Sequence, residues 1–558
     1  MKKNDRVLVQ ITGLTGAGSG VGRVNGMAIF VAGAAVGDEL IAHIIKVKKS
    51  YAVGIIHKLV IPSKNRKPVD CPVFGRCGGC TFRHLTYQAE SAAKQQAVQD
   101  VMQRIGGVQK PPEPIIVAQN TVHYRNKAQY PAANGKNGVC FGFYAGHTHR
   151  VIPQSSCCLQ PKIFGAALNA VKQWANSFGI KAYQEQTGSG LLRHVLLRFA
   201  EATGQLMVVP VINGTNLPFA EQLVQQLQGA VGSALQTVCY NINTEKTNVV
   251  LGPQCCTVYG SGFITDEICG VQVRISPQSF YQVNRTMATV LYQKAAGFIT
   301  PADRTILDLF CGTGTVGLSV LRCTGDLTKA LIGVEIVPSA VQDAEENARK
   351  AGVNARFICG DAGKAAEQLL LEGVCADVVV VDPPRKGCEP ALLQTIAGGF
   401  TPQKIIYISC EPATLARDVK QLQELNYRLE SYTPVDLFPG TAHVETVVLL
   451  SHKKADSYIH IDVEFGEGEG KIPVDSIAKR AEAYKPKEKV TYKMIKEYIE
   501  AKYGFKVHTA YIAEVKRNLG LPMYDAPNAV EELKQPRKHP TPEKVEAIKD
   551  ALRYFAVI

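Results

Sequence analysis

The chain has 558 residues and a formal net charge of +13, from 62 Lys and Arg against 49 Asp and Glu. It contains no apolar run of about eighteen residues and no signal-peptide architecture, so we expect a soluble, multi-domain protein without a membrane partner that stays in the cytoplasm. We also expect a monomer. The positive charge favours a polyanionic partner such as nucleic acid, although a hydrated basic surface would have the same composition.

The first sixty residues alternate short apolar stretches, such as Val7–Ile11 and Leu40–Val47, with glycines. Short strands at this spacing predict a small closed β-barrel of the oligonucleotide-binding kind over residues 1–60. Its basic side chains could contact RNA phosphates or could be ordinary surface charge. They include Arg23, Lys46, Lys48 and Lys49.

Sixteen cysteines in a chain without a secretion signal argue against a disulfide framework and favour metal binding or catalysis by some of them. Cys71, Cys77 and Cys80 lie in the stretch CPVFGRCGGC, whose glycines let the backbone wrap around one centre. Much later, Cys157 in VIPQSSCCLQP could join them. The spacing alone leaves zinc and an iron–sulfur cluster as alternatives.

Strand-like pieces such as Val195–Phe199 and helical pieces such as Phe164–Phe178 are mixed between residues 121 and 275. This mixture predicts an α+β central domain that, together with the cysteines, spans residues 61–275. The stretch HYRNK at residues 123–127 places an aromatic ring among cations. It could stack on single-stranded RNA or be an ordinary hydrated surface.

Helices and strands alternate from about residue 276 to residue 452, which predicts a doubly wound α/β sheet. The stretch TILDLFCGTGTVGL, residues 305–318, has the pattern of a strand, a glycine-rich turn and a helix, so backbone amides can approach a ligand. Glu335 ends the next strand, where a carboxylate can accept hydrogen bonds from ribose hydroxyls. These features do not separate a nicotinamide dinucleotide from S-adenosylmethionine.

Two further apolar strands end at side chains that can carry chemistry. Residues 377–381 lead into Asp382 and two prolines, and residues 405–408 lead toward Cys410, which a helix follows from Pro412. Because ligands collect at the carboxyl edge of an open α/β sheet, Cys410 is a candidate nucleophile. A buried structural cysteine is the alternative.

The last strand of this domain begins at Glu445, after the short Pro439-Gly440 turn. Such a connection is too short for a parallel crossover, so we expect this strand to be antiparallel.

We expect residues 453–558 to form a small, mostly helical extension. Gly-Glu repeats at 465–470 suggest a linker, and Thr491–Gly520 has the pattern of two amphipathic helices joined by a turn at Gly504. The lysines at the start of this segment could contact nucleic acid, or the segment could be a simple appendage packed on the surface. Its lysines are Lys485, Lys487, Lys489, Lys493 and Lys496.

Five motifs in this order resemble the RNA (uracil-5-)-methyltransferase family, whose members methylate carbon 5 of uridine in ribosomal or transfer RNA. They are SPQSFYQVN, DLFCGTGTVGL, DPPRKG, SCEPATLARD and FPGTAHVET. The resemblance spans about residues 1–452, and the N-terminal segment resembles the TRAM domain. It implies a seven-stranded Rossmann-like methyltransferase domain over residues 276–452 that uses S-adenosylmethionine.

The resemblance also implies residue roles. Cys410 would add as a thiolate to carbon 6 of uracil, and Glu445 would remove the carbon 5 proton. Since an ordinary thiol with a pKa of ~8.5 is mostly protonated at neutral pH, we expect the site, helped by the helix after Pro412, to favour the anion. The cofactor would contact Gln282 and Phe310, with its ribose at Glu335 and its adenine near Asp361, and Asp382 would lie where the cofactor and the base meet.

For the cysteines, the resemblance implies a [4Fe–4S] cluster held by Cys71, Cys77, Cys80 and Cys157, whose register fits better than that of Cys158. The barrel and these four cysteines favour the 23S ribosomal RNA branch over a transfer RNA enzyme. An iron–sulfur oxidoreductase and a non-catalytic RNA-binding protein are less favoured candidate functions. An N6-adenine methyltransferase is disfavoured because Arg385, not an aromatic residue, follows the DPP motif.

Overall fold

The structure is a computed structural model, and it describes residues 1–453, 492–519 and 539–555. Its internal contacts divide the chain into two compact units, Met1–Tyr458 and Ile459–Ile558. None of the described helices is both long enough and apolar enough to cross a membrane.

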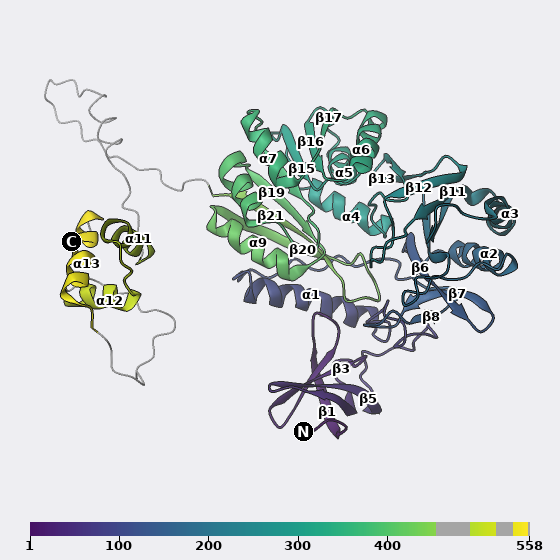
Figure 1. Cartoon of the computed structure of the whole chain (residues 1–558), viewed down its shortest axis with the longest axis horizontal. Coiled ribbons are helices and arrows are strands. Elements are labelled where there is room, and N and C mark those ends of the chain that lie inside the picture. The colour runs from purple at the N-terminus through teal and green to yellow at the C-terminus, as the bar shows by residue number, and fades with distance from the viewer. Residues whose placement is uncertain (454–491, 520–538, 556–558) are drawn as a thin grey trace. The chain divides into compact units, whose positions relative to one another are not determined.

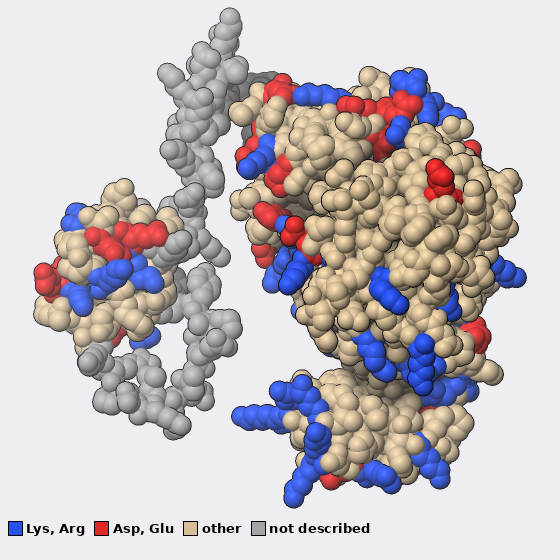
Figure 2. All heavy atoms as spheres, turned by 45° about the vertical axis from the view of Figure 1, so that its right-hand side comes forward, with Lys and Arg blue, Asp and Glu red and all other residues tan. Residues whose placement is uncertain are grey.

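The first unit begins with a closed five-stranded barrel in the strand order β1-β2-β3-β5-β4, which confirms the predicted barrel (Figure 1). Its core is aliphatic and contains Val9, Ile29 and Leu40. Residues 1–61 carry eight Lys and Arg against three Asp and Glu, and Figure 2 shows blue cationic side chains gathered on the barrel. The strands are β1 Arg6–Leu14, β2 Gly20–Val24, β3 Met27–Ala32, β4 Glu39–Val47 and β5 Tyr51–Ile61.

The central part holds a second, seven-stranded sheet in the order β12-β11-β10-β9-β6-β7-β8, with two helices packed on it around Trp174. A long helix, α1 (Tyr87–Arg104), precedes it, and a hairpin of β13 and β14 follows. The predicted mixture of helix and strand is therefore found. The elements are β6 Lys127–Gly135, β7 Gly138–Tyr144, β8 Val151–Pro153, α2 Ile163–Ser177, β9 Leu192–Ala200, β10 Gln205–Ile212, α3 Ala220–Val231, β11 Leu235–Ile242, β12 Gln254–Gly260, β13 Ile264–Ile268 and β14 Val271–Ile275.

The third part is a seven-stranded sheet in the order β17-β16-β15-β18-β19-β21-β20 between two helical layers (Figure 1). Strand β21 is antiparallel to both neighbours, as the short turn predicted. The strands are β15 Thr305–Leu309, β16 Ala330–Glu335, β17 Ala355–Cys359, β18 Val378–Val381, β19 Lys404–Ser409, β20 Tyr427–Val435 and β21 Glu445–His452.

The helices cover both faces of this sheet because its strands are apolar on both sides. The helices α4, α5 and α6 share a core with one face, and α7, α8 and α9 share a core with the other. Met102 of α1 belongs to the core that α7, α8 and α9 share with this sheet, so α1 packs on the sheet of the third part. The bounds are α4 Arg285–Ala296, α5 Thr315–Thr324, α6 Pro338–Ala351, α7 Ala362–Leu371, α8 Pro390–Gln394 with a π-helical turn Thr395–Phe400, and α9 Pro412–Glu424.

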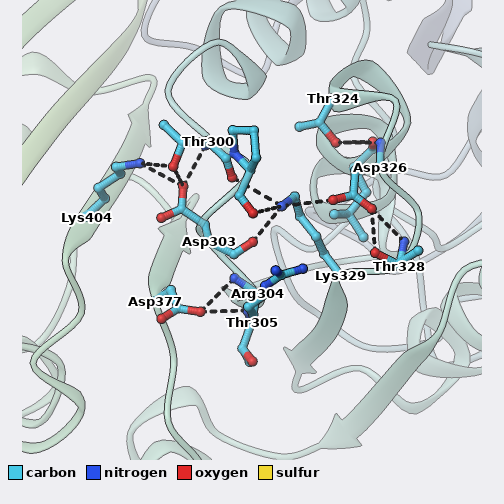
Figure 3. A network of polar contacts seen from close by, with 12 residues as sticks. Thr300, Asp303, Arg304, Thr305, Thr324, Asp326, Thr328, Lys329, Asp377 and Lys404 are labelled. Atoms are coloured by element: carbon cyan, nitrogen blue, oxygen red, sulfur yellow. Dashed lines mark hydrogen bonds and ion pairs between the residues drawn. The ribbon is translucent and has the colours of Figure 1, made fainter.

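A polar network fixes the amino-terminal end of the sheet (Figure 3). Asp377 accepts hydrogen bonds from the backbone N–H groups of Arg304 and Thr305 at 2.7 and 2.9 Å, which joins the start of β18 to the start of β15. Lys404 at the start of β19 pairs with Asp303 at 2.7 Å. The register of the central strands is thus held at one end, which leaves the carboxyl end to carry the functional loops.

The second unit contains three described helices, α11 (Tyr492–Tyr503), α12 (Thr509–Asn518) and α13 (Pro542–Tyr554), around a core that includes Ile499 and Ile548. The two helices predicted around Gly504 are found, whereas α13 was not predicted. The predicted linker at 465–470 and three of the lysines, Lys485, Lys487 and Lys489, lie outside the described residues.

Candidate active site

A thiol and two carboxyl groups lie at the carboxyl edge of the sheet formed by β15 to β21. Asp382 directly follows β18, and Cys410 directly follows β19. Because β21 is antiparallel, its first residue, Glu445, lies at the same edge, where Thr446 pairs with Ser409. The charges of Glu445 and Asp382 both act on the Cys410 thiol. The structure therefore brings together the three residues that the sequence placed on separate strands.

The Cys410 thiol is half-buried, and burial is the main reason that its pKa rises to about 11. The carboxyl groups of Glu445 and Asp382 raise this pKa further, while the charge of Arg385 and its hydrogen bond to Cys410 lower it. The expectation that the site favours the thiolate was therefore wrong for the site without ligands.

The carboxyl groups at this edge also resist ionisation. Burial, followed by the charge of Asp382, raises the pKa of Glu445 well above its usual range. Burial alone raises the pKa of Asp382 to about 7. Behind them, burial raises the pKa of Asp308 to about 8, although the N–H of Gly317 donates a hydrogen bond to this carboxyl at 2.9 Å. A cation bound here would favour the carboxylates.

Sequence reasoning missed two members of this buried group. Asp308 lies inside the apolar run of β15, and Tyr292 lies on the buried face of α4. Burial and then the charge of Asp382 raise the pKa of Tyr292. A polar residue within an apolar strand was the available signal for Asp308, whereas the helical pattern around Tyr292 resembles that of any buried tyrosine.

The glycine-rich turn after β15 leads into α5 as the sequence predicted. Gly314 at the N-cap of α5 has a left-handed φ of 74°, and Phe310 is held at a φ of 68°, which is uncommon for a bulky residue. The carboxylate of Glu335 accepts a hydrogen bond from the N–H of Gly312 at 3.1 Å and another from Val337 at 2.9 Å. Through these two hydrogen bonds Glu335 fixes the glycine-rich turn. It is also the last residue of β16 and so lies at the carboxyl edge of the sheet, where ligands bind in such folds.

Two further residues predicted to bind the cofactor, Asp361 and Gln282, differ in burial. Asp361 is exposed and caps α7, where it accepts hydrogen bonds from the N–H groups of Gly363 and Lys364 at 3.1 and 3.2 Å. Gln282 is 6% exposed in the loop before α4, and its carbonyl accepts a hydrogen bond from the Asn126 side chain at 3.0 Å. Phe310, Glu335, Asp361 and Asp382 thus follow or end four neighbouring parallel strands.

A buried ion cluster holds the loop between β20 and β21. The ammonium of Lys94 on α1 is 2.8 Å from Glu90 and 2.7 Å from Asp436, and all three side chains are buried. Glu90 also accepts a hydrogen bond from the N–H of Gly440 at 2.6 Å. Because an unpaired buried charge is costly, this cluster ties the segment that leads to Glu445 firmly onto α1.

Cys410 opens onto a large cleft of about 1440 Å³. The walls are the barrel, one face of α1, and the loops that carry Cys410 and His443. Partial burial in this cleft and then the charge of Arg385 lower the pKa of His443, which keeps the imidazole neutral. The cleft is larger than the usual small-molecule site, and it connects the barrel with the Cys410 thiol.

Tyr124, the aromatic residue of the HYRNK stretch, has a structural role. Tyr124 is 5% exposed, and its hydroxyl donates a hydrogen bond to the carbonyl of Pro439 at 2.9 Å. The hypothesis that this ring stacks on RNA was therefore wrong, because the ring packs inside the protein and supports the loop before β21.

The cysteines of the central part lie near one another. Cys80 interacts electrostatically with Cys71, Cys77 and Cys158, and Cys157 interacts with Cys158 and Cys80. The N–H of Gly79 donates to the Cys77 sulfur at 3.4 Å. No group of three or more His, Cys, Asp or Glu among the described residues is arranged to hold a metal ion. The iron–sulfur cluster therefore stays a prediction.

Known proteins resemble both the catalytic part and the barrel. A model of the tRNA (Uracil-5-)-methyltransferase family matches residues 270–453, and a TRAM domain model matches residues 2–56. Uncharacterized RNA methyltransferases of Clostridium tetani and Halalkalibacterium halodurans are each 40% identical to this chain, over 454 and 456 residues. These matches cover 81% of this chain and 97% and 98% of the two relatives.

Among solved structures, the tRNA (uracil-54, C5)-methyltransferase of Pyrococcus abyssi in complex with S-adenosyl-L-homocysteine has a TM-score of 0.64 with this chain. The two are 26% identical, and the match covers 80% of this chain and 100% of that one. The region matched by the tRNA (Uracil-5-)-methyltransferase family model, residues 270–453, contains Asp382, Cys410 and Glu445.

Proposed function

This chain belongs to the RNA (uracil-5-)-methyltransferase family, and from that premise we propose that it methylates carbon 5 of a uridine through a covalent bond between Cys410 and the base. The observation that supports this mechanism best is the convergence of Cys410, Glu445 and Asp382 on one sheet edge, where the thiol opens onto the cleft. A structural cysteine would need neither the carboxyl group nor the opening.

The chemistry follows from the reactivity of uracil. The Cys410 sulfur adds to carbon 6, and the electron pair of the carbon 5–carbon 6 double bond moves to carbon 5 and oxygen 4. When bound, S-adenosylmethionine would supply the methyl group that carbon 5 captures and would leave as S-adenosylhomocysteine. The positive charge of its sulfonium would favour ionised carboxyl groups nearby. Glu445, as a carboxylate, then removes the carbon 5 proton, the double bond forms again, and the sulfur leaves as a thiolate.

The cofactor would lie along the strand ends. Phe310, Glu335, Asp361 and Asp382 follow or end neighbouring parallel strands, which is where ligands bind in such sheets, and Gln282 precedes α4. We assign Glu335 to the ribose and Asp382 to the region of the sulfonium, because Asp382 is the one of these residues whose charge acts on Cys410.

The RNA would enter through the cleft between the barrel and Cys410. A base inside a helix could not reach a half-buried sulfur, so the target uridine must leave its stack. The basic barrel would hold the flanking phosphates without reading sequence. We propose 23S ribosomal RNA as the substrate, and transfer RNA is the second candidate because the Pyrococcus abyssi enzyme is a tRNA methyltransferase.

The four cysteines supply thiolate sulfurs, the donor type of a [4Fe–4S] cluster. Cys80 interacts electrostatically with Cys71, Cys77 and Cys157, and the N–H of Gly79 donates to the Cys77 sulfur. We propose Cys71, Cys77, Cys80 and Cys157 as its ligands. The cluster would cross-link the loop of residues 71–80 to the segment around Cys157. Thr81 and Phe82, next to Cys80, both donate to the Gly440 carbonyl at 2.9 Å, so the cysteine loop supports the same segment as α1.

Replacing the nucleophile tests the function directly. We expect Cys410→Ala to lower methyl transfer from labelled S-adenosylmethionine to RNA by about 10⁴-fold or more, because the addition step is lost. The substrates are ribosomal RNA and transfer RNA from cells that lack the protein, and 5-methyluridine is mapped in each. The exposed Cys375→Ala variant is the control. Normal turnover by Cys410→Ala would end the nucleophile assignment.

Replacing the base tests the last steps. With Glu445→Gln, the carbon 5 proton should leave about 10²- to 10⁴-fold more slowly, so a protein–RNA adduct stable to denaturant should accumulate when S-adenosylmethionine is present. Gel electrophoresis of labelled RNA detects it. The exposed Glu367→Gln variant should behave as wild type. Fast turnover without any adduct would assign the proton to another base.

Replacing single cysteines tests the cluster. Iron and acid-labile sulfide, measured after anaerobic purification, should be lost in Cys71→Ser and Cys157→Ser and kept in Cys158→Ser. The opposite result for the last two variants would assign the fourth ligand to Cys158. Wild-type protein that contains zinc, or no metal, would contradict the cluster.

A further inference from the structure

We propose that Arg198, on β9 of the central sheet, is a positioning residue for S-adenosylmethionine, because it holds the segment that carries Gln282 beside the ligand edge. This segment, residues 276–284, connects β14 to α4, and we call it the cofactor loop. The inference rests on the proposed contact between Gln282 and the cofactor. It adds that the central part completes a cofactor site whose other residues lie on the sheet of the third part.

The two ends of the cofactor loop are fixed at elements that border the ligand edge. At its start, the side chain of Asn347 on α6 accepts a hydrogen bond from the N–H of Arg274 at 2.9 Å and donates one to the carbonyl of Thr313, in the glycine-rich turn, at 3.0 Å. At its end, the side chain of Asn284 donates to the carbonyl of Leu437, in the loop before β21, at 3.0 Å. The loop therefore runs beside the edge where the cofactor is proposed to bind.

The middle of the cofactor loop is held from the central part. The guanidinium of Arg198 donates to the carbonyl of Pro277 at 3.3 Å and to the carbonyl of Ser279. Asn126, directly before β6, donates from its side chain to the Gln282 carbonyl at 3.0 Å and from its N–H to the following carbonyl at 2.8 Å. Carbonyl groups along the loop thus take their donors from residues of the central part.

Arg198 carries a buried charge, and burying a charge has a desolvation cost. The residue is 3% exposed, and although burial lowers its pKa to about 10, it stays a cation at neutral pH. Its neighbour on β6 is Lys127, and burial followed by the charge of Arg198 lowers the pKa of this lysine to about 7. A long apolar side chain could pack at this position without that cost. What the arginine adds is its hydrogen bonds to the cofactor loop.

The same strand provides a matched comparison. Arg193 of β9 is 6% exposed, and its guanidinium donates to the carbonyls of Asn243 at 2.9 Å and Glu245 at 2.7 Å. These carbonyls lie in the loop after β11 and not in the cofactor loop. Replacing either arginine removes a buried cation and its hydrogen bonds to loop carbonyls, but only Arg198 holds the cofactor loop.

An exposed side chain gives a second handle on the cofactor loop. Gln278 donates from its side chain to the carbonyls of Gly252 and Pro253 at 2.9 and 3.1 Å. Gly252 is itself fixed by Asn241 of β11, whose side chain accepts its N–H at 2.7 Å. In Gln278→Glu, a carboxylate oxygen would face the two carbonyl oxygens, so the loop would lose this attachment without any change in the core.

Isothermal titration calorimetry of the whole enzyme with S-adenosylhomocysteine, in the absence of RNA, tests the proposal. In Arg198→Met we expect a dissociation constant about 10- to 100-fold higher than in wild type, because hydrogen bonds from a charged donor that order the loop are lost. Arg198→Lys should recover part of this loss, since an ammonium can still donate to the loop carbonyls. In steady-state kinetics, the KM for S-adenosylmethionine should rise while the KM for RNA stays unchanged.

Arg193→Met separates positioning from general stability. Thermal denaturation without ligand should show that both Met variants are less stable than wild type, whereas Arg193→Met should keep the wild-type dissociation constant. If Arg198→Met weakens binding no more than Arg193→Met does, Arg198 is only structural and the proposal is overturned. If Arg198→Met does not fold, Gln278→Glu decides: weaker binding supports the proposal, and an unchanged dissociation constant overturns it.

The titration needs neither RNA nor the Cys410 thiol, so its result is separate from the proposed reaction. Variants that lose affinity as expected, in an enzyme that does not methylate uridine, would support this inference and contradict the proposed function. Wild-type enzyme that binds no S-adenosylhomocysteine would overturn both.

Discussion

The reversed strand β21 is the constraint on which the catalytic edge depends. In a sheet of parallel strands, only strand ends and the loops after them reach the ligand edge. By running antiparallel between β19 and β20, β21 brings its first residue, Glu445, to the end of the strand that delivers Cys410. Both strands are buried, so the sulfur and the carboxyl group meet where charge is poorly solvated. The raised pKa values of Cys410 and Glu445 follow from this placement.

The loop before β21 joins α1, the cysteine loop and the central part of the chain to this edge. It contacts the Lys94 ion cluster of α1, the residues that follow Cys80, and the Tyr124 hydroxyl. The same α1 forms a wall of the cleft that runs from the barrel to Cys410. A displacement of the barrel side or of the cysteine loop would therefore reach the segment that carries His443 and Glu445.

Local pattern was enough to predict much of this. Apolar runs that stop at Asp382 and Cys410, and a turn too short for a crossover before Glu445, predicted both the sheet edge and the antiparallel strand. The local sequence pattern could not predict contacts between segments that are distant in the sequence. Lys94 pairs with Asp436 across 342 positions. The thiol pKa depends on burial and on residues from two other segments, the loop after β18 and the start of β21, which is why its direction was mispredicted. Tyr124 and Arg385 also showed their partners only in the folded chain.

The proposed reaction depends most on a covalent bond between Cys410 and the base, and RNA with 5-fluorouridine at the target position tests for that bond directly. Fluorine at carbon 5 cannot be removed as a proton, so the adduct should stop after methyl transfer. Mass spectrometry of the digested complex should then find the Cys410 peptide joined to a methylated fluorouridine. An adduct on any other residue, or steady methylation of natural RNA with no adduct on fluorinated RNA, would contradict the account.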